Sequence, residues 1–416
     1  VGRAGFALAH NGNLTNTAAL AEAAGMLPGI VASDSDLMAE LISRAFPPES
    51  DGTGGEGPPG RELDLAGALG EVLAELGGAF ALGAMDAGRL YAARDPHGFR
   101  PLCIGRFTYL AGGEERTGWA ISSESAALQV IGAELVRSVS EGELVVIDSG
   151  GPRSVHFCDE CMVAPRLCVF ELVYFARPDT VLGGREVYSA RRKMGELLAH
   201  QAPVGADLVI GVPDSGVTAA EGYAIASGIP FGQGLVKNRY IGRTFIAPTQ
   251  EARALGVRRK LNPLREAIRG KRLVVVDDSI VRGTTTGQIV RMLREAGASE
   301  VHLRISSPPF RWPCFFGIDT PARDELIAAR LTEEGVRAHV GADSLAYLSL
   351  EHLLEAVAAP GGAGGAGYCR ACLTGVYPAP VPVGLDELDA SLESGAGPPG
   401  AASGPVGGAV LASARR

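Results

Sequence analysis

Residues 273–287 constrain the fold more than any other part of this chain. Four apolar residues, 273–276, lead into two adjacent carboxylates, Asp277 and Asp278, and then into a turn rich in glycine and threonine. A short strand that is apolar on both faces is typical of a parallel sheet covered by helices. The turn follows the carboxyl end of the strand and opens a helical pattern over residues 288–296. Ligands bind at this position in α/β proteins.

The turn at 283–287 has the chemistry of a phosphate site. Its backbone N–H groups and three threonine hydroxyls lie at a helix N-terminus, which favours an anion. The turn has no lysine, so the ordinary P-loop pattern GxxxxGK[ST] is excluded. Two carboxylates beside a phosphate would repel it unless they bind something else, such as sugar hydroxyls and Mg²⁺. A plain strand–helix turn with capping carboxylates is the alternative.

The whole segment resembles the phosphoribosyl pyrophosphate (PRPP) loop of type I phosphoribosyltransferases. The resemblance implies that Asp277 and Asp278 hold the ribose hydroxyls and Mg²⁺, and that the turn holds the 5′-phosphate. The PRPP-binding residues that it implies are Asp277, Asp278, Ser279, Arg282, Gly283, Thr284, Thr285, Thr286 and Gly287.

Two further segments fit the same substrate. The predicted strand 206–212 ends in a small-residue turn that contains Ser215. In phosphoribosyltransferases this is the pyrophosphate loop, and Ser215 matches a residue near the metal. The basic string KNRYIGRTF, residues 237–245, resembles the mobile loop of glutamine PRPP amidotransferases. The resemblance implies that Lys237, Arg239 and Arg243 close over pyrophosphate; a solvated basic loop is the alternative.

The first half of the chain carries a different set of motifs. A predicted strand, 6–9, precedes the polar, turn-like segment 10–16, in which Asn-Gly is also an ordinary hairpin signal. The segment resembles the oxyanion-hole region of N-terminal-nucleophile glutamine amidotransferases, which gives that role to Asn11 and Gly12. The matching role for Asp34 is to bind the α-amino group of glutamine, although Ser33 or Asp34 could simply cap a helix.

The nucleophile of that family is an N-terminal cysteine, whereas Val1 opens this sequence. We therefore expect the chain to lack its true N-terminus and to use ammonia in place of glutamine. Cys103 lies in a predicted strand, 102–105, where a buried small hydrophobe is the expected role.

The seven cysteines allow two kinds of metal site. Cys158 and Cys161 form a CxxC pair that a second pair, Cys369 and Cys372, could complete as a zinc site. The segments around another set resemble those of the Bacillus-type, cluster-containing amidotransferases. That resemblance implies a [4Fe–4S] cluster, with a structural role, bound by Cys168, Cys314, Cys369 and Cys372. Cys158 and Cys161 are then two free thiols.

Composition limits the partners. The formal net charge of −9 argues against a general binder of nucleic acid or anionic membranes. No apolar run reaches the length of a membrane span, and no signal-peptide pattern opens the sequence, so we expect a cytoplasmic protein.

These motifs predict an α/β and α+β chain. An incomplete N-terminal-nucleophile glutaminase αββα sandwich precedes a type I phosphoribosyltransferase parallel-sheet domain. The expected divisions are a glutaminase domain, a linker, a phosphoribosyltransferase domain, a cysteine-bearing segment and a disordered tail, at 1–150, 151–167, 168–350, 351–385 and 386–416.

The resemblance runs from Val1 to about Pro378 and identifies the chain as a member of the glutamine PRPP amidotransferase family. It implies an enzyme of purine biosynthesis that makes 5-phosphoribosylamine from PRPP and glutamine or ammonia. Its expected cofactors are Mg²⁺ and the [4Fe–4S] cluster, its inhibitors purine nucleotides, and its assembly a homotetramer. A phosphoribosyltransferase that uses only free ammonia, a PRPP-sensing transcription regulator and a zinc-stabilised interaction protein are the alternatives.

Overall fold

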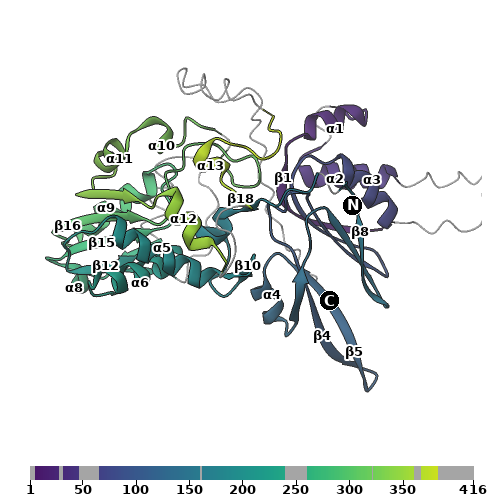
Figure 1. The fold of residues 1–416 in the computed structure, drawn as a ribbon, viewed down its shortest axis with the longest axis horizontal. Helices are drawn as coiled ribbons and strands as arrows, with labels where there is room; N and C mark the ends of the chain where they lie inside the picture. Colours follow the sequence, from purple (N-terminus) through teal and green to yellow (C-terminus); the bar gives the residue numbers. More distant parts are fainter. Residues whose placement is uncertain are drawn as a thin grey trace, which may run out of the picture.

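The computed structural model describes residues 5–27, 31–45, 65–159, 162–238, 260–320, 322–359 and 367–382. They form two lobes, which Figure 1 shows side by side. The expected tail at 386–416 lies outside these residues, as do Arg239, Arg243 and Cys161.

The amino-terminal lobe is built on two antiparallel sheets. The larger has the strand order β1-β2-β3-β7-β8 and comprises Ala7–Leu14, Gly78–Met85, Leu90–Arg94, Glu143–Asp148 and Gly151–His156. The smaller has the order β5-β4-β6 and comprises Glu114–Ser122, Cys103–Ala111 and Glu134–Ser138. Residues 151–156, expected in a linker, form β8 because their backbone pairs along β7.

Side-chain alternation along the larger sheet produces its layers. Phe80 and Leu82 of β2 pack against helices α2 (Asp34–Ala45) and α3 (Leu65–Glu75), beside the short α1 (Thr17–Ala23). Ala81 points the other way and packs with Ile104 of the smaller sheet. Helix α4 (Ser125–Val130) packs through Leu128 against Cys103 of β4. The lobe therefore has the predicted α-β-β-α order.

The carboxyl-terminal lobe holds a parallel four-stranded sheet. Its order is β12-β15-β16-β17, formed by Leu208–Gly211, Arg272–Asp277, Glu300–Ile305 and Ser344–Tyr347. One face packs on α5 (Val187–Gln201), α6 (Ser215–Ser227) and α12 (Leu350–Val357). The other packs on α9 (Thr284–Glu295) and α11 (Glu333–Val340). Burial on both faces confirms the expectation drawn from residues 273–276.

The remaining elements are short. The short helical elements are the π-helical turn η2 (Glu171–Phe175), α8 (Arg265–Ile268), α10 (Ile327–Arg330) and α13 (Ala371–Thr374). The short strands are β9 (Leu167–Cys168), β10 (Val181–Leu182), β11 (Arg185–Glu186), β13 (Leu235–Lys237), β14 (Leu261–Pro263) and β18 (Tyr368–Cys369).

The sequence expectation for the first strand of the amino-terminal lobe was wrong. The segment 10–16 was expected to turn after a strand at 6–9, but β1 continues to Leu14 in register with β2. Gly12 permits this because a Cβ there would lie 2.1 Å from the carbonyl oxygen of Ala79. A pairing with a strand almost seventy residues away overrode the local turn signal of Asn-Gly.

Candidate active site and cysteine centre

The acidic pair lies at the carboxyl end of β15, and both side chains are buried. The backbone N–H of Asp278 donates to Oδ1 of Asp277 at 3.0 Å. Burial, together with the neighbouring Asp278 carboxylate, raises the pKa of Asp277 well above its usual range. Burial also raises the pKa of Asp278, although hydrogen bonds from Ser215 and Ser279 and the charge of Arg191 oppose it. The pair therefore favours a bound cation or sugar hydroxyl donors.

The glycine-threonine turn begins α9, as expected. Gly283 is the N-cap at φ 76°, a left-handed conformation that favours glycine. The threonines form the first turn of the helix, where Thr286 is buried and Thr285 is exposed. Among the described residues no side chain caps this helix end, so the N–H groups of its first turn remain suited to an anion.

The second predicted loop meets the first at Asp278. Ser215 begins α6, which follows β12 after a three-residue turn, and its hydroxyl donates a hydrogen bond to Oδ2 of Asp278. Gly216 makes the approach possible, because a Cβ there would lie 2.4 Å from the carbonyl oxygen of Val276. Ser279 donates to the other oxygen of Asp278 at 2.5 Å. Three sequence-predicted residues thus converge on one edge of the sheet.

Two basic residues of the predicted site, Arg282 and Lys237, are paired with carboxylates of the same lobe. Arg282 donates from Nε to Glu325 at 2.7 Å, so its charge is paired within the lobe. Lys237, at the end of β13, forms an ion pair with Asp214 of the second loop. Next to this pair, a cavity of about 680 Å³ is lined by Pro213, Phe231 and Lys237, among others.

Sequence reasoning missed Arg191 on α5. The side chain is buried and donates to the carbonyl oxygens of Leu172 and Ala176, at 2.9 and 2.8 Å. Burial raises the pKa of Asp278, and the positive charge of Arg191 opposes that rise. The available signal was an arginine between Ala190 and Met194, on the apolar side of the helix.

In the amino-terminal lobe the structure brings Asp34 against β1. Its carboxylate accepts the backbone N–H of Leu14 at 3.3 Å and lies 3.6 Å from Nδ1 of His10. Burial opposes ionisation, but the hydrogen bond and charge of His10 outweigh it and lower the pKa of Asp34. Asn11 donates from Nδ2 to the hydroxyl of Ser123 at 3.3 Å. The sequence did not single out His10.

Ser33 and Cys103 have the structural roles that the sequence also allowed, a helix cap and a buried small side chain. The hydroxyl of Ser33 accepts the N–H of Asp36 at 3.2 Å and so caps α2. Cys103 begins β4 and is buried, and burial raises the pKa of its thiol to about 11. A thiol in this state is a poor nucleophile.

Four cysteines expected to act together come close to one another. Cys168 of β9 pairs in register with Cys369 of β18, and α13 carries Cys372. Burial, and to a lesser degree the neighbouring Cys314, raises the pKa of Cys369 and Cys372. Cys158 lies elsewhere, against Gly142 in the amino-terminal lobe. Within the part of the chain that the structure describes, no group of three or more His, Cys, Asp or Glu is placed to hold a metal ion.

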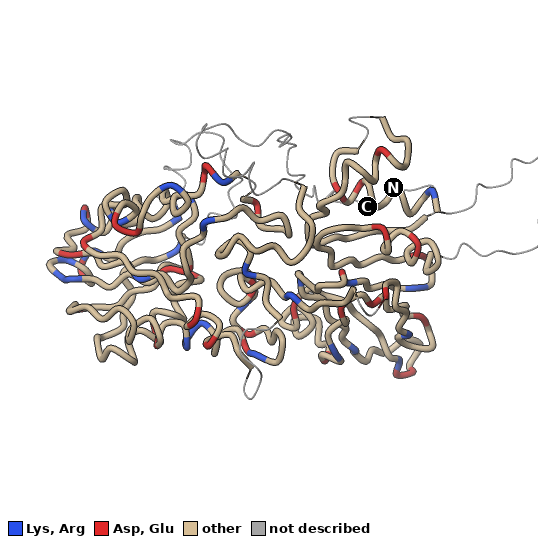
Figure 2. Tube along the Cα trace, turned by 45° about the horizontal axis from the view of Figure 1, so that its top comes forward, with Lys and Arg blue, Asp and Glu red and all other residues tan. Residues whose placement is uncertain are grey.

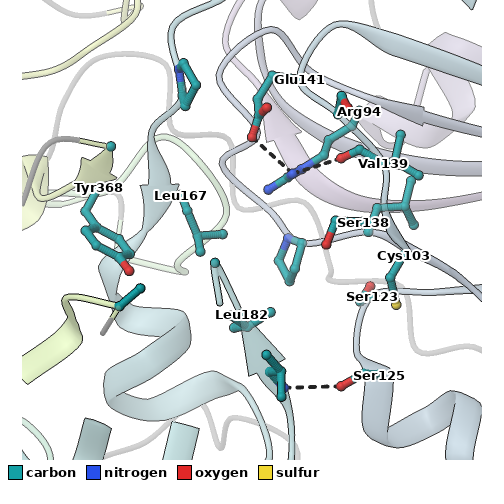
Figure 3. Close-up of a pocket in the computed structure, with 18 of the residues that line it drawn as sticks. Arg94, Cys103, Ser123, Ser125, Ser138, Val139, Glu141, Leu167, Leu182 and Tyr368 are labelled. Carbon is teal, nitrogen blue, oxygen red and sulfur yellow. Dashed lines mark hydrogen bonds and ion pairs between the residues drawn. The ribbon is translucent and has the colours of Figure 1, made fainter. Parts of the chain in front are cut away.

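A cavity of about 370 Å³ lies between the lobes (Figure 3). Ser123, Ser125 and Arg94 line it from the amino-terminal lobe, and Leu182 and Tyr368 face them. The hydroxyl of Ser125 accepts the N–H of Val181 across it at 3.2 Å. The adjacent Glu124 accepts the N–H of Arg177 at 2.7 Å, so polar contacts join the lobes here.

Basic and acidic residues are interspersed over both lobes (Figure 2). Among the described residues, no helix is long and apolar enough to cross a membrane.

Comparison with known proteins places these features in one family. The phosphoribosyl transferase domain model matches residues 185–306, which include both ligand loops. The amidophosphoribosyltransferase of Mycobacterium tuberculosis is 48% identical over 390 residues, covering 91% of this chain and 68% of the relative. Those of Synechococcus elongatus and Archaeoglobus fulgidus are each 45% identical, covering 93% and 91% of this chain and 74% and 78% of theirs.

A solved structure agrees. The glutamine PRPP amidotransferase of B. subtilis, complexed with ADP and GMP, superimposes with a TM-score of 0.76 at 43% identity, covering 90% of this chain and 78% of the other. The chain therefore belongs to the amidophosphoribosyltransferase family, enzymes that act as pentosyltransferases.

Proposed function

We propose that this chain joins ammonia to C1 of PRPP, releasing pyrophosphate and giving 5-phosphoribosylamine, the first committed step of purine synthesis. The observation that carries the proposal is the convergence of two anion-binding turns on Asp278, through Ser215 on one side and Ser279 on the other. The turn at Gly283 holds the 5′-phosphate, and the turn at Ser215 holds the pyrophosphate. Asp277 and Asp278 accept the ribose hydroxyls between them.

The residues present also fit Mg²⁺. Proteins usually hold this ion through one or two carboxylates, and substrate phosphates supply further oxygens. Asp277 and Asp278 would provide the carboxylates, with Ser215 beside them. The ion, when bound, offsets the charge that develops on the leaving pyrophosphate.

The chemistry asks mainly for positioning. C1 gains oxocarbenium character as its bond to pyrophosphate breaks, and neutral ammonia forms the new C–N bond and then loses a proton. Lys237 at the end of β13, followed by Arg239 and Arg243, closes over the pyrophosphate and keeps water from C1. Holding both reactants in line supplies much of the rate.

We further propose a glutamine site in the amino-terminal lobe. We assign the oxyanion hole to Asn11 and Gly12, and the α-amino group of glutamine to Asp34. We propose that this chain turns PRPP over with ammonia. Cys103 is not assigned as a glutaminase nucleophile, because it is buried and the pKa of its thiol is raised.

The cysteine centre fits a [4Fe–4S] cluster better than a single ion. Four irons and four sulfides separate the thiolates of such a cluster, whereas a single ion needs its ligands close together. The backbone N–H of Phe316 donates to Sγ of Cys314 at 3.4 Å. Such donors favour thiolate. We assign the cluster to Cys168, Cys314, Cys369 and Cys372, with a structural role.

Purine nucleotides and self-association complete the proposal. The B. subtilis structure was solved with ADP and GMP. We infer that purine nucleotides inhibit this chain as well, and that it assembles as a homotetramer.

The proposal is tested by pyrophosphate release from PRPP and Mg²⁺, with ammonium and separately with glutamine. We expect turnover with ammonium. No turnover with either nitrogen donor would contradict the proposal and favour a PRPP-binding regulator.

A further inference from the structure

Arg100 of the amino-terminal lobe contacts the other lobe beside the cysteine centre, which comprises Cys168, Cys314, Cys369 and Cys372. Its guanidinium donates to Oε1 of Glu171 at 2.8 Å and to the carbonyl oxygen of Gly317 at 3.0 Å. The residue is only 6% exposed, so both contacts are shielded from water. Arg100 is thus a buried cation at the boundary between the lobes.

The contacts of Arg100 flank two of the four cysteines. Gly317 follows Cys314 by three residues, and a Cβ at Gly317 would lie 3.1 Å from Nε and 3.3 Å from Nη2 of Arg100. The guanidinium therefore lies directly against the backbone of the Cys314 loop. The preceding residue, Phe99, accepts the backbone N–H of Cys168 at 3.0 Å, and its ring stacks on Phe316 at 4.2 Å.

One donor of this guanidinium is left without a partner. Nε of Arg100 is buried and has no hydrogen-bond acceptor in the described residues, although the two terminal nitrogens are bonded. Buried donors in folded proteins nearly always have partners, so a lone one calls for a group that is bound there.

A cluster would supply the acceptor that the Nε donor of Arg100 lacks. Four thiolates around a [4Fe–4S]²⁺ core leave a net charge of about −2, and the sulfurs accept hydrogen bonds that tune the centre. Glu171 accepts from Nη1 of the guanidinium at 2.8 Å, so Nε remains to donate to a bound acceptor.

We propose that Arg100 is a positioning residue for the cluster, donating Nε–H to one of its sulfurs and offsetting its negative charge from the opposite lobe. The inference rests on the cluster assigned above. It adds that cluster retention depends on how the amino-terminal lobe docks. Loss of the cluster would leave Arg100 with an unpaired donor and loosen that contact.

The test compares variants purified without oxygen. Iron and acid-labile sulfide are measured per chain, followed by the rate of iron release to a ferrous chelator. We expect Arg100→Gln to release iron about tenfold faster or more than the parent chain, as is usual when a partner of a metal ligand is removed. Arg100→Lys keeps the charge and should restore most of the retention.

Further variants separate the cluster from the ion pair. Glu171→Gln leaves the cation in place, so its iron release should match or be slower than that of the parent chain. Arg100→Gln/Glu171→Gln removes the buried pair symmetrically and should still release iron quickly. Arg137→Gln breaks a comparable pair with Glu143, at 2.7 Å, within the amino-terminal lobe and should change nothing in iron release.

Hydrogen exchange supplies a readout that does not depend on iron. In cluster-free protein we expect faster exchange at residues 99–103 and 314–318 than in the loaded chain. A parent chain without iron would contradict the cluster and this inference together. An iron-loaded parent whose Arg100→Gln variant releases iron at the same rate would overturn the inference alone.

Discussion

The two predicted ligand sites hold their carboxylates in opposite electrostatic states. Asp34, in the amino-terminal lobe, already has partners in His10 and Leu14, and its pKa is lowered. Asp277 and Asp278 are buried side by side, and their pKa values are raised. A site with satisfied charge is stable without a ligand, whereas a site with crowded charge gains stability when a cation arrives.

This contrast indicates a division of labour between the lobes. The phosphoribosyl site gives up some stability to keep two carboxylates ready for Mg²⁺ and ribose, as functional sites often do. The amino-terminal site keeps Asp34 ionised through its own residues, ready for an ammonium group such as the α-amino group of glutamine. Replacing the carboxylates by amides should therefore stabilise the chain at Asp277 and Asp278 and destabilise it at Asp34.

The largest expected effect is on catalysis. Asp278→Asn should lower ammonia-dependent turnover by on the order of a hundredfold, because carboxylate-held metal ions supply several kcal/mol of transition-state stabilisation. Initial rates of pyrophosphate release measure it. Ser43→Ala, on α2 of the other lobe, is a control expected to keep the parent rate, since its hydroxyl only bonds its own helix. A near-parent rate in Asp278→Asn would contradict the assignment of Asp278 to the phosphoribosyl site.

A smaller effect is expected at Arg191. Arg191→Gln removes the cation that acts on Asp278, so kcat/KM for PRPP should fall roughly tenfold. The neighbouring Arg192 is exposed on the same helix and gives a matched control in Arg192→Gln. Equal loss in both variants would show that Arg191 acts only through the stability of α5.

Stability against pH sharpens the contrast further. Above the unfolded-state value of 3.8, the folded state retains protons on Asp277 and Asp278 that the unfolded chain has lost, so stability falls as pH rises. Asp277→Asn/Asp278→Asn should therefore raise the melting temperature without Mg²⁺, and the gain should grow with pH. Thermal unfolding between about pH 5 and 8 measures it. A melting temperature below that of the parent chain at every pH would contradict the assigned strain.

The smallest effect belongs to Asp34. Its ionised form contributes stability above pH 3.8 that is lost as pH falls through the lowered folded-state pKa. Asp34→Asn should thus cost up to about 1 kcal/mol at neutral pH, and the difference should vanish in acid. Ammonia-dependent turnover should not change. A fall in that turnover would show that the two sites are not separate.

Local patterns sufficed for much of the fold. Helix α2 begins at Asp34, directly after Ser33, which the sequence offered as a possible cap, because capping is a short-range signal. The parallel sheet was likewise readable from short apolar strands that alternate with helices. The motif resemblance placed Ser215 and Asp278 in one site before the structure showed their hydrogen bond.

Long-range contacts explain what was missed. The extension of β1 through Gly12 depends on β2, which lies far away in the sequence. His10, Arg191 and Arg100 act through partners on other elements, at Asp34, Asp278 and Gly317, and a single sequence contains no signal for such pairings. The partner of Lys237 was unexpected for the same reason.

Calorimetric titration of PRPP into the protein, with and without Mg²⁺, tests the central claim most directly. The acidic pair at the end of β15 is expected to bind PRPP tightly only when the cation is present. The account predicts tight binding by the parent chain in Mg²⁺, and binding at least tenfold weaker after Mg²⁺ removal or in Asp278→Asn. Equal affinity in all three measurements would contradict it.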